Sequence, residues 1–201
     1  MNTTLKSPAR FLPYGRQSIS QEDIDAVTAV LKSDFLTQGP AIEQFERGLA
    51  VAVSARHAVA CSNGTAALHL ALMALDINRN DIVVTSPNTF VASANCARYV
   101  GAEVKFCDID PKTGLLDPIE LECLLSKDKQ RRIKAIIPVH FAGQSAEMPK
   151  IDELARAHGA YVVDDACHAL GAGYKESGRR HTIGDNSHSD LTVFSFHPVK
   201  H

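Results

Sequence analysis

A lysine near the end of the chain and an aspartate upstream of it could together hold a cofactor. Lys200 closes a segment, residues 194–200, that follows a predicted strand, and a lysine there can form a Schiff base with a cofactor aldehyde. Asp164 and Asp165 end an apolar run, so one of them should have a cationic partner. Such a carboxylate could pair with a protonated pyridine nitrogen. The lysine and the aspartate together indicate a pyridoxal phosphate enzyme.

Other candidate side chains come directly after other predicted strands. Gly64 and Thr65 join a strand to a helix, where backbone N–H groups and the Thr65 hydroxyl could bind a phosphate. Phe90 could stack on a planar ring, Ser195 could supply a hydroxyl for a phosphate, and His168 lies near the aspartates. Each of these residues alone has an ordinary structural explanation as a turn, a core aromatic or a packed side chain. Their recurrence at successive strand ends favours a common site.

Composition narrows the class of protein. The 201 residues are 45% hydrophobic and 22% charged, which is ordinary for a soluble globular protein. A net charge of -2 gives no electrostatic reason to expect a nucleic acid or an anionic membrane as partner. Five cysteines without a C-x-x-C pair fit reduced thiols, and no segment resembles a signal peptide or a membrane span. We therefore expect a cytoplasmic protein. The nine histidines match no metal-binding motif, so we expect no metal site.

The spacing of apolar residues predicts two helices followed by an α/β unit. A capping-box-like start at Ser20 opens a helix to about Ser33, and a second helix covers residues 42–53. Short apolar runs then alternate with helices, which is typical of a mostly parallel sheet with helices on both faces. The expected strands are 57–61, 81–85, 103–109, 133–139, 161–164 and 191–196, with helices over 66–75, 91–99, 118–125 and 149–158. The polar stretch 175–189 is expected to be an exposed loop.

Four segments together resemble the DegT/DnrJ/EryC1/StrS family of sugar aminotransferases. They are residues 13–17 (PYGRQ), 34–40 (DFLTQGP), 86–92 (SPNTFVA) and 194–200 (FSFHPVK), and the resemblance runs from about residue 11 onward. It implies the aspartate aminotransferase-like fold of type I pyridoxal phosphate enzymes, with residues 1–53 as an N-terminal arm with helices and 54–201 as the cofactor-binding large domain. The resemblance also implies a homodimer.

The resemblance implies roles for individual residues. Lys200 corresponds to the catalytic lysine that holds the cofactor, Asp165 to the partner of its pyridine nitrogen, and Phe90 to the aromatic residue that stacks on its ring. The other implied cofactor contacts are Gly64, Thr65, His168 and Ser195, and the implied sugar-nucleotide contacts are Tyr14, Asp34, Phe35, Leu36, Thr37 and Asn63.

The reaction implied is transfer of an amino group from L-glutamate to a UDP-linked 4-keto-6-deoxy amino sugar, as in pseudaminic acid biosynthesis. Lys200 would move a proton while Asp165 keeps the pyridine nitrogen protonated. A pyridoxal phosphate-dependent sugar dehydratase of the same fold is a rival, but there the lysine is replaced, so Lys200 disfavours it.

The family pattern continues beyond the lysine, whereas this chain ends at His201. Family members continue with a glycine-rich segment, a further strand and a C-terminal small domain, so we expect an incomplete large domain and no small domain. Asn63 stands where a serine is usual in close relatives. A further alternative is therefore a non-catalytic fragment of such an enzyme.

Overall fold

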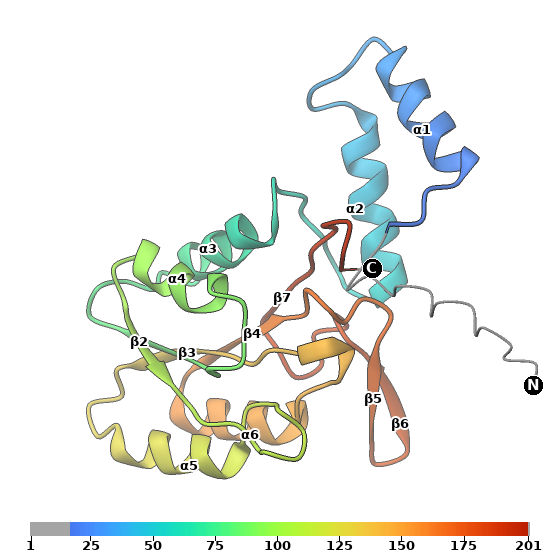
Figure 1. Ribbon diagram of the computed structural model, residues 1–201. Coiled ribbons are helices and arrows are strands. Elements are labelled where there is room, and N and C mark those ends of the chain that lie inside the picture. The colour runs from blue at the N-terminus through green and yellow to red at the C-terminus, as the bar shows by residue number, and fades with distance from the viewer. Residues whose placement is uncertain (1–16, 201) are drawn as a thin grey trace, which may run out of the picture.

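A parallel β-sheet covered by helices on both faces forms the body of the protein (Figure 1). The computed structural model describes residues 17–200. Five strands lie in the order β2–β1–β3–β4–β7, and every neighbouring pair is parallel. The strands are β1 (Ile82–Thr85), β2 (Glu103–Phe106), β3 (Ile133–Ile137), β4 (Tyr161–Asp165) and β7 (Leu191–Val193). The predicted α/β class, with a parallel sheet between two layers of helices, is confirmed.

Alternating side chains of the central strands supply two separate cores. Ile82 and Val84 of β1 pack on one face with residues of α5 (Pro118–Lys127) and α6 (Met148–His158). Val83 points to the other face and packs with residues of α3 (Gly64–Ala74) and α4 (Ala92–Tyr99). All four residues of β1 are buried because both faces of the strand are covered. Short, continuously apolar runs were therefore a correct signal for the central strands.

The helices begin at residues suited to capping. Asn63 accepts a hydrogen bond from the N–H of Ala66 at the start of α3, and Asp117 accepts one from Ile119 at the start of α5. Gly159 ends α6 in the left-handed conformation, with φ of +79°, which a residue with a Cβ atom adopts at a cost. These local signals fix where the helices begin and end.

Two N-terminal helices extend away from the sheet (Figure 1). The predicted capping box is present at the start of α1 (Gln21–Leu31), where Ser20 and Asp23 exchange hydrogen bonds. The second helix, α2 (Pro40–Val53), begins with its proline and buries Val53 at its last residue. No residue of α1 is buried, and its apolar residues Val27 and Leu31 are more than 60% exposed.

Two local predictions were wrong. Residues 57–61 form no strand, since no described segment pairs with them; Val59 is exposed and the N–H of Ala60 donates to the Glu46 carboxylate at 2.7 Å. Residues 175–189 are not an exposed loop. They belong largely to a hairpin of β5 (Gly173–Glu176) and β6 (Arg179–Thr182) and to the turn after it, in which His181, Ile183 and Ser189 are buried. Strands β2, β3 and β7 also end earlier than expected.

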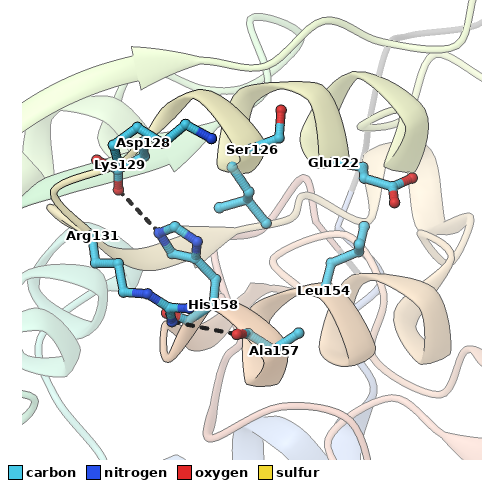
Figure 2. Close-up of a pocket in the computed structure, with 9 residues that line it drawn as sticks. Glu122, Ser126, Asp128, Lys129, Arg131, Leu154, Ala157 and His158 are labelled. Carbon is cyan, nitrogen blue, oxygen red and sulfur yellow. Dashed lines mark hydrogen bonds and ion pairs between the residues drawn. The ribbon is translucent and has the colours of Figure 1, made fainter.

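A hollow between α5 and α6 lies on the sheet face opposite α3 and α4 (Figure 2). Its volume is about 350 Å³. The Asp128 carboxylate closes one end, accepting hydrogen bonds from the Ile133 N–H at 2.7 Å and from the His158 ring at 3.0 Å. Burial opposes ionisation of Asp128, but the Ile133 and Arg132 N–H groups and the His158 ring hold its pKa below the usual value.

We expect Asp128→Asn to reduce the free energy of unfolding at pH 7 by about 1 kcal/mol, because a charged hydrogen-bond acceptor is lost. Folding lowers the pKa of this carboxylate, so its ionised form stabilises the protein at pH values above about 3.9, the pKa of an aspartate in the unfolded chain. This stabilisation is lost as the pH falls through the pKa that the carboxylate has in the folded protein. The difference in free energy of unfolding between the parent and the variant should therefore be largest above about pH 4 and should decrease below it. Urea unfolding followed by circular dichroism from pH 7 to pH 2 measures it.

Glu122 lines the same hollow and provides the matched control. Glu122→Gln should leave the pH dependence of unfolding as in the parent protein. A difference between parent and Asp128→Asn that grew on acidification would contradict the assigned role of Asp128.

None of the helices in residues 17–200 has the length and apolar character needed to cross a membrane.

Candidate active site

The candidate residues gather at the edge of the sheet where its parallel strands end. Asp165 is the last residue of β4, Ser195 lies two residues after the end of β7, and Phe90 lies in the loop between β1 and α4. Gly64 and Thr65 form the first turn of α3. Carboxyl ends of parallel strands share one edge, and this is where ligands bind in such sheets. The topology thus brings together residues that are far apart in the sequence.

Asp165 is buried and held by backbone and side-chain hydrogen bonds. Its N–H donates to the carbonyl of Pro138, and its carbonyl accepts from the N–H of His140, so the backbone is fixed against the segment after β3. The carboxylate accepts from the Ser93 hydroxyl at 2.5 Å and from the Cys167 N–H at 3.2 Å. These partners satisfy part of the carboxylate's hydrogen-bonding capacity and fix its orientation.

Asp164 points to the opposite face of the sheet, as alternation along a strand requires. Its carboxylate lies 3.7 Å from His140 Nε2 and accepts a hydrogen bond from the Thr192 hydroxyl at 3.3 Å. Both His140 and Asp164 are buried. His140 is therefore the side chain that packs beside the Asp164 carboxylate.

Lys200 lies against His168 and Phe90. Its Nζ atom is 2.7 Å from His168 Nε2 and 6.0 Å from the centre of the Phe90 ring. The Lys200 N–H donates to the carbonyl of His197, which forms a turn that carries the lysine back toward the strand ends. The Phe90 side chain is 65% exposed, so one face of this aromatic ring is open to a planar ligand.

The first turn of α3 lies close to the end of β7. A Cβ atom on Gly64 would lie 3.2 Å from Cys167 Sγ and 3.7 Å from Ser195 Oγ, so glycine permits this close approach. Helix α3 directs its N-terminal N–H groups toward the same place. Backbone N–H groups, the Thr65 hydroxyl and the Ser195 hydroxyl together make a place suited to an anion.

Burial and the Asp165 carboxylate raise the pKa of Cys167, although Lys200 acts in the opposite direction. The thiol therefore stays protonated at neutral pH and contributes volume rather than charge. Its Sγ atom lies beside Gly64, and the neutral thiol does not compete with the Asp165 carboxylate for a cation.

The residues expected to contact a sugar are not all near Lys200. Asp34, Phe35, Leu36 and Thr37 are exposed in the loop between α1 and α2, at the outer end of the helix pair (Figure 1). Asn63 lies next to Gly64, where its side chain caps α3 by accepting from Ala66 at 2.9 Å. Tyr14 lies outside the described residues.

Sequence reasoning missed three residues that shape the site. Ser93 contacts Asp165 across 72 residues of chain, and the Thr89 and Ser93 hydroxyls lie 2.7 Å apart. His140 faces Asp164, and Cys167 packs beside Gly64. In the sequence, Thr89 and Ser93 stand on either side of Phe90 with the spacing of one helical turn. This spacing is the sequence signal that could have suggested Ser93.

Comparison with known proteins gives a consistent result. Residues 17–201 match the model of the DegT/DnrJ/EryC1/StrS aminotransferase family. The spore coat polysaccharide biosynthesis protein SpsC of Bacillus subtilis is 44% identical over 190 residues, which cover 94% of this chain and 46% of SpsC. The UDP-4-amino-4,6-dideoxy-N-acetyl-beta-L-altrosamine transaminase of Campylobacter jejuni is 44% identical over 189 residues, covering 94% of this chain and 48% of that enzyme.

A solved structure shares the fold over the same extent. Helicobacter pylori PseC, an aminotransferase involved in the biosynthesis of pseudoaminic acid, superposes with a TM-score of 0.79 at 31% identity, covering 94% of this chain and 48% of PseC. The chain spans about half the length of the relatives it matches.

Proposed function

Because the chain belongs to the DegT/DnrJ/EryC1/StrS aminotransferase family, we propose that it provides the cofactor-binding part of a pyridoxal phosphate-dependent sugar aminotransferase. The family depends on pyridoxal phosphate, and its substrates are nucleotide sugars with an amino donor. One observation carries the proposal for this chain. The Lys200 amine lies at the strand ends, 2.7 Å from His168 and 6.0 Å from the Phe90 ring.

The residues at the strand ends fit the parts of pyridoxal phosphate. The phosphate would bind at the first turn of α3, where Gly64 leaves space beside Ser195 and Thr65 offers a hydroxyl. The pyridine nitrogen would face the buried Asp165 carboxylate, and the ring would lie against Phe90. When bound, the cofactor supplies an aldehyde that reacts with amines and a ring that accepts electrons from the substrate.

Each residue then has a separate task. Lys200 Nζ would hold the cofactor and, once released, move a proton at the substrate Cα. Asp165, buried and oriented by Ser93, would keep the pyridine nitrogen protonated through its negative charge. His168 would lie beside the ring, in contact with Lys200. The nearness of Lys200 to His168 and Phe90 supports this division of tasks.

For the substrates, we propose a UDP-linked 4-keto-6-deoxy amino sugar as acceptor and L-glutamate as donor. The Campylobacter jejuni relative supports this choice by its name, and PseC supports the pseudaminic acid pathway. SpsC is equally similar and is named for spore coat polysaccharide, so the shared chemistry is amino transfer to a nucleotide sugar.

For the assembly, we propose a homodimer in which the loop at residues 34–37 contacts the sugar bound to the neighbouring subunit. The position of this loop, at the outer end of α1 and α2, supports a contact outside its own subunit (Figure 1). Tyr14 and Asn63 are the other proposed sugar contacts.

The experiment that tests the function follows the two half-reactions separately. Purified protein loaded with pyridoxal phosphate is mixed with L-glutamate, and we expect the visible absorbance of the cofactor to change as 2-oxoglutarate forms. The aminated cofactor form should then convert a UDP-4-keto sugar to the amino sugar, detected by mass spectrometry. Failure to bind pyridoxal phosphate would reject the proposal, and binding without either half-reaction would favour the alternative of a non-catalytic fragment.

A further inference from the structure

The His168 ring is held between two nitrogen atoms, one on each side. The N–H of Ala142 donates to Nδ1 at 3.3 Å, and Lys200 Nζ lies 2.7 Å from Nε2. The Phe141 ring packs edge-on against the imidazole, with ring centres 5.9 Å apart. Turning the ring over would place carbon atoms opposite both nitrogens, so these two contacts fix its orientation.

The contact with Ala142 determines where the ring carries its proton. A backbone N–H can only donate, so Nδ1 must offer its lone pair. In the neutral imidazole the single proton is then on Nε2, and that N–H points at Lys200 Nζ. If both ring nitrogens were protonated, the Nδ1–H group of His168 and the N–H group of Ala142 would point at each other.

A proton on Nε2 has a consequence for the lysine. An ammonium group has three donors and no acceptor, so it cannot accept the Nε2–H bond, whereas an unprotonated amine can. The unprotonated amine is also the form that attacks an aldehyde. We infer that His168 is a positioning residue that holds the Lys200 amine unprotonated and ready to react with an aldehyde, an inference that rests on the proposed function of Lys200.

The conformation of Ala142 supports this arrangement. Ala142 lies in the short 3-10 helix η1 (Phe141–Gly143) with φ of +54°, a conformation that an alanine adopts only at a cost in free energy. The N–H presented by this strained residue is the one that reaches His168. Strain of this kind is retained where the position has a task.

Other titratable groups face the amine from neighbouring elements. The Asp165 carboxylate at the end of β4 would favour an ammonium, so His168 acts against it, while the Cys167 thiol is neutral because burial raises its pKa. His197 lies in the turn before Lys200 and is exposed. The loop with Phe90, the first turn of α3 and η1 contribute no titratable side chain here.

The reactivity of Lys200 tests the inference in protein without cofactor. The protein is treated briefly with acetic anhydride at pH values from 7 to 11, and acetylation of Lys200 is measured by mass spectrometry relative to exposed Lys129. At pH 7, we expect Lys200 of the parent to react roughly tenfold faster than Lys200 of His168→Leu. The difference should disappear at pH 11, where lysine amines are largely unprotonated.

Two variants separate proton placement from access. His168→Gln keeps an acceptor for Ala142 and a donor for Lys200, so it should retain the parent rate at pH 7. A rate difference between parent and His168→Leu that persisted at pH 11 would show that the histidine controls only access and would overturn the inference.

The tautomer can be read directly, even where a variant fails to fold. Two-bond ¹H–¹⁵N correlation spectra of the parent protein should show the His168 ring proton on Nε2, and a proton on Nδ1 would overturn the inference. Both measurements omit cofactor and substrate. They can therefore fail while transamination stands, and they can succeed in a protein that does not transaminate.

Discussion

Lys200→Ala is expected to abolish transamination, with a loss of at least about a thousandfold. Its amine is the proposed site of reaction with the cofactor aldehyde, and nearby His168 and Asp165 cannot replace a primary amine. The glutamate half-reaction, followed by the cofactor absorbance, measures the loss. Borohydride treatment followed by peptide mass spectrometry should add the reduced cofactor to Lys200 in the parent protein and to no peptide of the variant.

Lys150 offers a matched control for this substitution. Its Nζ atom contacts Glu153 at 3.0 Å on the exposed surface of α6, so Lys150→Ala removes an amine of the same kind away from the strand ends. We expect this variant to keep the parent rate. Turnover near the parent rate in Lys200→Ala would remove the basis of the proposed function.

Asp165→Asn is expected to lower the rate of both half-reactions by roughly a hundredfold or more. Loss of one partner of a buried charged pair costs about 3 kcal/mol or more, and tenfold in rate corresponds to about 1.4 kcal/mol. The amide keeps the shape of the side chain but cannot balance the positive charge of a protonated pyridine nitrogen. Stopped-flow absorbance measures each half-reaction, and circular dichroism shows whether the variant folds.

Ser93→Ala provides a graded comparison with Asp165→Asn. It leaves the carboxylate charged but removes the hydroxyl that binds it at 2.5 Å, so we expect a smaller loss than in Asp165→Asn. An Asp165→Asn enzyme with parent rates would contradict the role of Asp165. If Ser93→Ala were slower than Asp165→Asn, the contact that Ser93 of α4 makes would matter more for the rate than the charge of the Asp165 carboxylate.

Much of the fold was predictable because its signals are local. The buried run at Ile82–Thr85 and the apolar run that leads to Asp165 indicate strands covered on both faces, and both lie in the parallel sheet. Capping residues such as Ser20 and Asp117 mark helix starts through hydrogen bonds within a few residues. These elements are determined largely by interactions between residues that are close together in the sequence.

The failed predictions concern segments whose structure depends on distant partners. Residues 57–61 have strand-like composition, but a strand exists only when another strand accepts its hydrogen bonds, and none of the described residues does so. Residues 175–189 are polar, yet His181 is buried because its ring stacks on Tyr174 at 5.1 Å and lies beside Asp185. Composition alone did not reveal that packing.

Some features of the candidate site follow from the sequence, and others depend on distant partners. The sequence by itself determined the residue types, a lysine, an aspartate, an aromatic ring and a glycine-led helix start, and their order along the chain. Only the tertiary structure decided that Asp165 rather than Asp164 faces Ser93, and that Ala142 and Lys200 lie on either side of His168. The reason is physical: side-chain type is a property of one position, whereas orientation and proton placement depend on groups that only folding brings within hydrogen-bond distance.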